Sequence, residues 1–266
     1  YIRKTIDHAN KKIGYLMYNG FTSNYDYELN DAFAYFKAEN IDDLVIDLRY
    51  NGGGSVETSN DLASMVTGQF NGELFTTQVY NDNFENEERY FNNRISTGGT
   101  INSLNLNKVY VITTGSTASA SELLIASLRP YIDVIQVGTT TTGKYQGSVT
   151  LYDSPNFSRT NANIGHKYAM QPLILKTVNA NGFTDYFNGL TPNIEIGEDY
   201  ENLGILGEPT EPLLQAALNQ ALQLLLEYPD SVTLYNILGA ANQGLGKLDE
   251  AIEAYTKAIS IKPDFA

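Results

Sequence analysis

The sequence contains no cysteine and only two histidines, His8 and His166. Disulfide bonds, thiolate nucleophiles and zinc sites of the usual cysteine and histidine kind are therefore excluded. Apolar segments such as Leu222 to Leu226 are much shorter than the length that crosses a bilayer, so we expect no membrane span. The chain opens at Tyr1 without a charged and then apolar leader, and we expect it to be an excised piece.

Basic residues are also scarce, because 17 Lys and Arg stand against 31 Asp and Glu and leave a formal net charge of -14. This sign is wrong for holding phosphate backbones by counterion release, which argues against nucleic acid and anionic membrane surfaces as partners. Hydrophobic residues make up 42% of the 266 residues, and this length is enough for one large domain or for one domain plus a small appendage. Because cysteine is absent and histidine is scarce, catalytic chemistry would have to use hydroxyls, carboxylates, lysine or glycine amides.

Short apolar segments alternate with segments of helical spacing along most of the chain. Strands are predicted at 12–18, 43–48, 76–80, 108–113, 134–137, 148–152 and 168–178. Pro172 indicates an edge position or a bulge in the last of them. Helices are predicted around Leu29, Phe33 and Phe36, at 56–65 and at 119–128, whereas the rest of 70–100 is polar surface. This alternation of strands and helices predicts an α/β fold.

The C-terminal part of the chain changes character at an acidic stretch, 197–212, which carries Gly204, Gly207, Pro209 and Pro212. Everything after it is predicted to be helical, and 232–265 resembles one tetratricopeptide repeat. The matching positions are Tyr235, Leu238, Gly239, Ala251, Tyr255, Ala258 and Pro263. One repeat cannot bury its own apolar face, so we expect it to stack on the helix at 213–226 or on further repeats. The predicted domains are a core at 1–197, a linker at 198–212 and an all-α segment at 213–266.

Three segments contain the residues on which chemistry can depend: the glycine-rich loop 47–54, the serine-rich segment 116–122, and Gly143 with Lys144. The glycine run after a buried strand can be a simple turn, and its spacing fits neither a dinucleotide fingerprint nor a P-loop. Otherwise its backbone N–H groups are free to bind a ligand oxygen.

Ser119 precedes Glu122 by three residues, which is the pattern of a helix capping box. A hydroxyl at a helix N-terminus also lies beside unpaired N–H groups that favour an oxyanion. Ser121 is about 200° further round the same helix, so only one of the two serines can face a cleft.

A serine nucleophile needs a base to take its proton. A Ser-His pair depends on His166 or His8, and His166 lies in a polar loop where we expect it to be solvated. Lys144 is the other candidate, provided that burial keeps its amine neutral. No Asp or Glu occurs between Val134 and Tyr152 to hold this lysine charged, although a solvated surface lysine is the usual alternative.

Together these motifs resemble the C-terminal-processing, or tail-specific, serine proteases over roughly 12–196. The matching motifs are D-L-R-x-N-x-G-G at Asp47 to Gly54, S-A-S-E at Ser119 to Glu122, V-G-x-x-T-x-G-K at Val137 to Lys144, and G-L-T-P-N at Gly189 to Asn193. The resemblance implies a Clp-protease/crotonase-like core of twisted ββα units. It also implies a Ser119 nucleophile, a Lys144 general base, and an oxyanion hole from the N–H groups of Ala120 and Gly53. It implies neither a metal nor a cofactor.

Two departures from the family concern substrate capture and the lysine. The PDZ module that usually precedes this core is missing from this chain, so substrate choice is not readable. Where the family often has Gln four residues after the lysine, this chain has Ser148, and Gln146 follows at two residues; either is a candidate to orient Lys144. The resemblance further implies polypeptide substrates and a location in the bacterial periplasm or cell envelope. The repeat suggests a protein partner by analogy.

Three functions are compatible with these observations. The leading one is a serine endopeptidase that cleaves flexible polypeptide tails through an acyl-enzyme on Ser119. The second is a catalytically silent relative that uses the cleft and the repeat as a binding module, which Ser148 leaves open and the Ser119 and Lys144 pair argues against. The third is crotonase-like acyl-thioester chemistry, which needs an oxyanion hole but no serine nucleophile.

Overall fold

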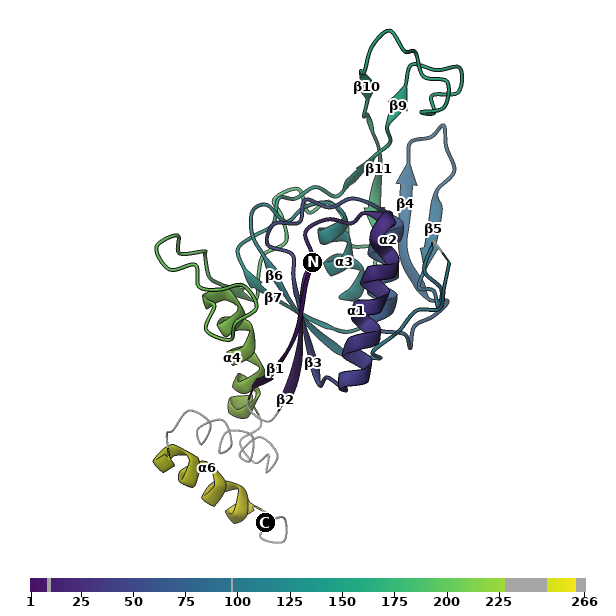
Figure 1. Cartoon of the computed structure of the whole chain (residues 1–266). Coiled ribbons are helices and arrows are strands. Elements are labelled where there is room, and N and C mark those ends of the chain that lie inside the picture. The colour runs from purple at the N-terminus through teal and green to yellow at the C-terminus, as the bar shows by residue number, and fades with distance from the viewer. Residues whose placement is uncertain (9–10, 97, 228–247, 262–266) are drawn as a thin grey trace.

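The computed structural model describes residues 1–8, 11–96, 98–227 and 248–261, and its centre is a six-stranded sheet (Figure 1). The strand order is β1-β2-β3-β6-β7-β12. Only the β1–β2 pair is antiparallel; every other neighbouring pair is parallel. The strands are β1 (Ile2–His8), β2 (Lys11–Met17), β3 (Asp43–Asp47), β6 (Lys108–Thr113), β7 (Asp133–Gly138) and β12 (Ile194–Glu195). The predicted α/β class is confirmed.

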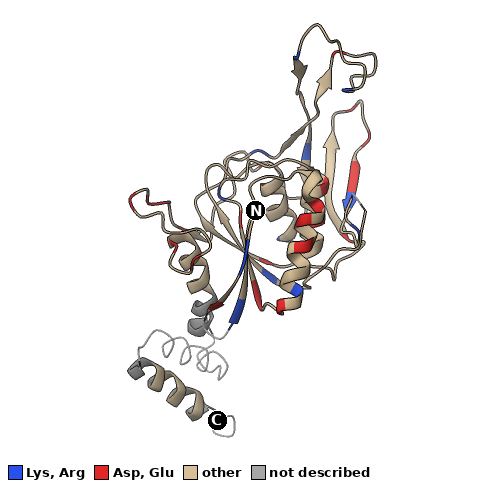
Figure 2. Cartoon of the chain, viewed as in Figure 1, with Lys and Arg blue, Asp and Glu red and all other residues tan. Residues whose placement is uncertain are grey.

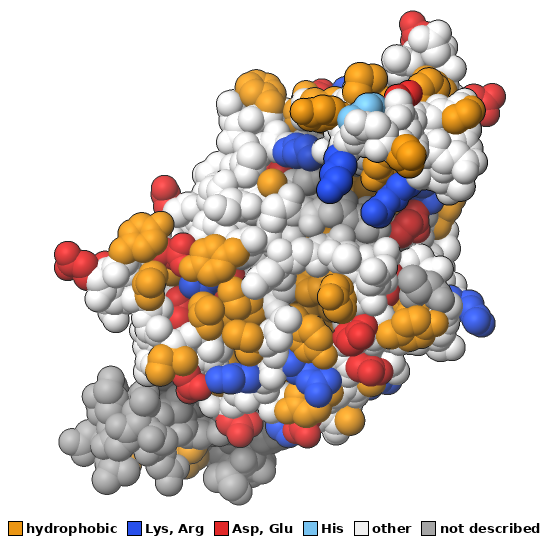
Figure 3. Space-filling view, turned by 45° about the horizontal axis from the view of Figure 1, so that its top comes forward, with side chains coloured by type: hydrophobic (Ala, Val, Ile, Leu, Met, Phe, Trp, Pro, Cys, Tyr) orange, Lys and Arg blue, Asp and Glu red, His pale blue; other side chains and the backbone are white. Residues whose placement is uncertain are grey.

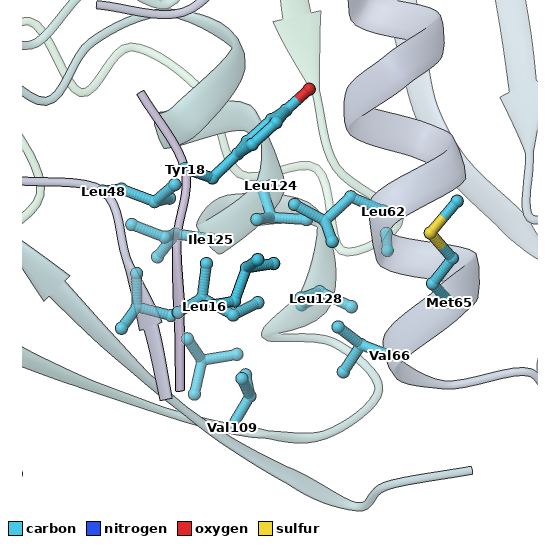
Figure 4. Packing of buried hydrophobic residues seen from close by; sticks show 14 of the residues in the cluster. Leu16, Tyr18, Leu48, Leu62, Met65, Val66, Val109, Leu124, Ile125 and Leu128 are labelled. Atoms are coloured by element: carbon cyan, nitrogen blue, oxygen red, sulfur yellow. The ribbon is translucent and has the colours of Figure 1, made fainter. Parts of the chain in front are cut away.

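Helices cover both faces of this sheet (Figure 1). On one face lie α1 (Asp26–Glu39), α2 (Val56–Val66) and α3 (Ala120–Leu128), and on the other lies α4 (Pro212–Glu227). Side chains alternate along a strand, so Val109 and Val111 join the core under α1–α3, whereas Tyr110 and Ile112 pack toward α4. Figure 4 shows residues of the first core, including Leu16, between the strands and helices α2 and α3.

A second, four-stranded antiparallel sheet lies beside the first, with the order β5-β4-β11-β8. Its strands are β4 (Leu74–Tyr80), β5 (Glu87–Tyr90), β8 (Gln146–Ser148) and β11 (Leu173–Val178). Pro172 separates β11 from the short strand β10 (Ala169–Met170) because proline has no N–H to donate to a ladder. The predicted strand at 168–178 is therefore two strands.

Strand β10 pairs with β9 (Leu151–Tyr152) in an arm that projects from the body (Figure 1). The arm exposes Phe157, Tyr168 and Met170 together with cationic side chains (Figure 3). We call residues 149–171 the arm.

Strands β1 and β5 and the short helix η1 (Ser23–Tyr25) are absent from the sequence prediction. β1 is a mostly polar strand at the sheet edge in which only Ile6 is buried, and β5 is the largely exposed segment E-E-R-Y. Figure 2 marks acidic positions in red on β5 and along α1. Because β1 and β5 consist mostly of polar residues, a prediction based on apolar segments does not detect them.

The C-terminal segment begins with α4, whose Leu213, Leu214, Ala217 and Leu218 are buried against the main sheet. Helix α6 (Leu248–Ile261) covers the second half of the predicted repeat and buries Ala251 and Ala258. The repeat positions 235, 238, 239 and 263 lie outside the described residues. The division at 198–212 stays a prediction. No helix in the described part of the chain is long and apolar enough to cross a membrane.

Candidate active site

The three predicted motif segments meet at one edge of the main sheet. They follow β3, β6 and β7, and because these neighbouring strands are parallel, their carboxyl ends lie together. The carbonyl of Asn51 in the first loop accepts the N–H of Ala118 in the second at 3.1 Å. Thr142 in the third donates its N–H to Thr117 in the second at 2.9 Å. The fold therefore assembles the glycine loop, the serine segment and the lysine loop into one site.

Ser119 lies immediately before α3 in an unusual backbone conformation, with φ 60° and ψ -116°. This combination is outside the left-handed helical region that Asn and Asp tolerate, and such strain costs about 1–3 kcal/mol where the surroundings enforce it. The side chain is partly exposed, faces the Glu122 N–H in a capping box, and donates no hydrogen bond within the described residues. Ser119 therefore lies at the helix N-terminus in the capping box that its S-x-x-E pattern predicts, with its hydroxyl hydrogen unbonded in the described structure.

Ser121, the other candidate nucleophile, is fully buried and donates its hydroxyl to the carbonyl oxygen of Asn51 at 2.9 Å. This places its side chain away from solvent, on the side of α3 that packs against the glycine loop. Its hydroxyl joins two loops of the site.

Glu122 is a buried carboxylate that joins the serine segment to the lysine loop. One oxygen accepts the N–H of Ser119 at 2.8 Å and the N–H of Lys144 at 2.9 Å. The other accepts the Thr141 hydroxyl at 2.5 Å and the Gly143 N–H at 2.6 Å. Because one oxygen binds both main chains, Ser119 and Lys144 are held side by side. The sequence indicated only the capping half of this arrangement.

Lys144 is half-buried, and its ammonium group has neither an ion pair nor a hydrogen bond in the described part of the chain. Glu122 contacts only its main chain. The preceding Gly143 has φ 90°, and a Cβ there would lie 2.3 Å from the carbonyl oxygen of Phe187, so only glycine fits. This close approach fixes the loop that positions the lysine.

Gln146 and Ser148, the residues proposed to orient the lysine, are the two ends of β8. Both are partly buried, and neither hydrogen-bonds the Lys144 ammonium group in the residues described. Their orienting role stays a prediction.

The predicted oxyanion hole consists of Ala120 and Gly53. The N–H of Ala120 has no hydrogen-bond partner in the described structure. Gly53 has φ 101°, and a Cβ on it would lie 2.6 Å from the Ser119 Cβ and 2.9 Å from the Ala120 nitrogen. Its own N–H donates to the Asn51 side chain at 2.9 Å. Gly53 thus lies against Ser119, and its N–H is bound by the Asn51 side chain.

Neither histidine is bonded to Ser119 in the described structure. His166 lies in the arm, 3.2 Å from Asp153, and is exposed, as its polar loop predicts. His8 ends β1, where burial lowers its pKa. The described residues also contain no group of three or more side chains suited to a metal ion.

A buried charge cluster lies under the start of the glycine loop. Arg49 is 1% exposed and bonds Glu211 through two parallel contacts of 2.8 and 2.9 Å. Its Nε also lies 3.0 Å from both oxygens of Asp47, which accepts the Tyr15 hydroxyl at 2.7 Å. Burial alone would lower the pKa of Arg49, but these carboxylates raise it above its ordinary value. Sequence reasoning missed Glu211, which is 162 positions from Arg49.

The pKa of Glu211 is below its ordinary value. Burial alone would raise it, but hydrogen bonds from Arg49 and the Leu214 N–H, with the guanidinium charge, outweigh that effect. A carboxyl with a depressed pKa contributes stability above its unfolded-state pKa and loses that contribution as the pH falls through the folded-state pKa.

We therefore expect the wild-type protein to unfold at a higher temperature than Glu211→Gln at neutral pH, and the difference to shrink as the pH enters the acid range. Thermal unfolding of both proteins over a pH series measures it. A difference that stays constant with pH would contradict the charged contact.

The comparisons with known proteins agree on the catalytic core. The model of peptidase family S41 matches residues 12–196, and the tetratricopeptide repeat model matches 232–265. Among proteins with curated functions, none matches the chain. A Bacteroides fragilis NCTC 9343 structure assigned to the S41 proteases has a TM-score of 0.75 and 29% identity, covering 84% of this chain and 57% of its own.

Two more distant solved structures share the fold. The photosystem II D1 C-terminal processing protease has a TM-score of 0.53 and 20% identity, covering 73% of this chain and 44% of that one. Mature CPAF has a TM-score of 0.56 and 14% identity, covering 86% of this chain and 55% of that one. The chain spans about half the length of these three relatives.

Proposed function

The chain belongs to peptidase family S41 and carries a tetratricopeptide repeat, and we propose that it is a serine endopeptidase with Ser119 and Lys144 as its catalytic pair. The resemblance drawn from the motifs is confirmed at the level of the family. The observation that supports this pair most directly is the Glu122 oxygen that binds the main chains of both residues. Assembly of the pair by a third group is what activation of a hydroxyl by a base requires.

The proposed reaction proceeds through an acyl-enzyme. The Ser119 hydroxyl attacks the scissile carbonyl carbon while the neutral Lys144 amine takes its proton. The resulting oxyanion accepts a hydrogen bond from the N–H of Ala120, and a second from the N–H of Gly53 once that group turns away from the Asn51 side chain. Collapse breaks the C–N bond, and the Lys144 ammonium protonates the leaving amine. Water then cleaves the ester, passing a proton to Lys144, which returns it to Ser119.

The proposed substrates are flexible polypeptide tails. Strand β8, which begins two residues after Lys144, is the last strand of its sheet and pairs only with β11. An edge strand next to the catalytic pair offers backbone groups to which an extended polypeptide can add as a further strand. A flexible tail adopts this extended form readily, and a folded domain does not. A location in the bacterial periplasm or cell envelope is proposed from the family resemblance alone.

The test of this proposal is proteolysis of a folded protein that carries an unstructured C-terminal extension. We expect cleavage within the extension and an intact folded part. Mass spectrometry of the products identifies the cleavage sites. The same protein without its extension is the control. Equal cleavage of both would contradict the preference for flexible tails.

A catalytically silent binding module is the second candidate. It is favoured by one observation, the absence of a hydrogen bond between the Ser119 hydroxyl and the Lys144 ammonium group in the described structure. Catalytic hydrogen bonds often tighten only when substrate binds, so this geometry does not exclude the peptidase. Peptide binding without cleavage at any pH would favour the silent module.

The repeat at 232–265 is proposed to dock a protein partner and to contribute no catalytic group. A variant that ends at Pro229 is therefore expected to hydrolyse a small unstructured peptide at close to the full-length rate. Partner docking would be weakened. Peptide hydrolysis by both chains, with circular dichroism to confirm folding, measures this. Loss of hydrolysis in a folded truncated chain would show that the repeat shapes the active site.

A further inference from the structure

The buried charge cluster connects α4 to the loop that carries Gly53. Arg49 lies in a turn in which the N–H of Asn51 donates to the carbonyl of Leu48 at 2.9 Å. The Arg49 carbonyl accepts the hydroxyl of Thr114, which lies in the loop after β6. Its guanidinium group bonds Glu211. The turn is thus held both through the main chain of Arg49 and through its buried side chain.

Asn51 connects this turn both to the serine segment around Ser119 and to Gly53. Its carbonyl accepts the Ala118 N–H at 3.1 Å and the Ser121 hydroxyl at 2.9 Å, so it holds the residues on either side of the nucleophile. Its side-chain oxygen accepts the Gly53 N–H at 2.9 Å, and its side-chain nitrogen donates to the Tyr18 carbonyl at 2.8 Å. A shift of Asn51 would therefore move Gly53 relative to Ser119.

Glu211 is itself firmly held. It is 1% exposed and accepts the N–H groups of Leu213 and Leu214 at 3.4 and 2.8 Å, at the N-terminus of α4. Asp47 belongs to the strand that leads into the loop, whereas Glu198 is 3.6 Å from Arg49 and bonds Tyr50. Glu211 is thus the carboxylate that makes a two-pronged contact with Arg49 from a separate, packed helix.

We propose that Glu211 is a positioning residue for the peptidase reaction, acting through Arg49 to fix the turn that places Gly53 beside Ser119. The inference rests on the proposed function for its kinetic part. Without the Glu211 charge, a buried guanidinium loses its forked partner and must seek other acceptors, which displaces the turn. Glu211 also caps α4, so one carboxylate joins the start of this helix to the turn.

The first test compares Glu211→Gln with Leu218→Ala, a fully buried α4 residue in the core between this helix and the sheet. The second variant loosens the same helix without touching the cluster. Saturation kinetics with an alkyl fluorophosphonate separate the limiting labelling rate from the half-saturating concentration. We expect Glu211→Gln to lower the limiting rate about tenfold or more, since small misplacements of reacting groups are costly. Half-saturation should change little, and Leu218→Ala should keep the wild-type rate.

Hydrogen exchange followed by mass spectrometry gives a second readout that needs no activity. Glu211→Gln should increase exchange in 48–55 and 116–122, whereas Leu218→Ala should increase it only in α4. If wild-type protein is not labelled, the proposed peptidase function fails, and this exchange pattern alone still decides whether Glu211 positions the turn. Unchanged exchange in 48–55, or the same increase in both variants, would overturn the inference.

Glu211→Asp serves where Glu211→Gln does not fold. It keeps the charge but places it one methylene further from Arg49. The limiting labelling rate should therefore fall, and the exchange of 48–55 should rise, each by less than for complete loss of the Glu211 contact. Wild-type values for both quantities in Glu211→Asp would overturn the proposal.

Discussion

Ser119→Ala is expected to abolish peptidase activity, with a loss on the order of 10⁴-fold or more, as for removal of other serine nucleophiles. Its side chain lies at the N-terminus of α3, is partly exposed and donates no hydrogen bond in the described structure. Folding should change by only about 1 kcal/mol, the usual effect of removing an N-cap side chain, because the Glu122 bond to the Ser119 main chain survives the substitution. Peptide hydrolysis and thermal unfolding measure the two effects.

Ser121→Ala is the matched control, two residues away on the same helix. It removes the bond to the Asn51 carbonyl, which still accepts the Ala118 N–H. We expect reduced stability and retained activity. Activity that survives in Ser119→Ala and disappears in Ser121→Ala would identify Ser121 as the nucleophile.

Lys144→Ala is expected to be as damaging as Ser119→Ala. A nucleophile and its base act as a unit, so the double variant should be no worse than either single one. Lys144→Arg should also be inactive, because a guanidinium group is never neutral and cannot accept the proton. Hydrolysis of one small peptide by all four variants measures this.

His166→Ala is the control for the base. His166 lies in the arm and contacts Asp153, so its removal should leave the rate unchanged. The arrangement Ser119-Lys144 would be contradicted by a protein that loses activity with His166→Ala and keeps it with Lys144→Ala.

The sequence predicts the parts of the fold that are buried on both faces. The segment 108–113 is an apolar run because β6 lies between the two cores, and its predicted and observed limits agree. β1 and β5 are polar strands at sheet edges, and their residues give no comparable signal. Pro172 correctly indicates an irregularity, but not that a separate arm ends there.

In the candidate site, too, the sequence predicts some features and not others. Ser119, Ala120, Gly53 and Lys144 fall on segments that parallel strands bring to one edge, so motif order locates them. The contacts that organise them depend on distant pairs. The sequence pattern indicates Glu122 only as a helix-capping residue, yet three of its four hydrogen bonds come from residues 141–144. Glu211 gives no local signal at all, because its partner Arg49 is contributed by another part of the chain.

Labelling of the folded protein by a fluorophosphonate, followed by peptide mapping, tests the central claim most directly. An activated hydroxyl reacts with this probe, whereas a hydroxyl that only caps a helix does not. The expected result is one phosphonate on Ser119, no adduct in Ser119→Ala, and strongly slowed labelling in Lys144→Ala. A folded wild-type protein that remains unlabelled, or that carries its adduct on another residue, would contradict catalysis by Ser119 and Lys144.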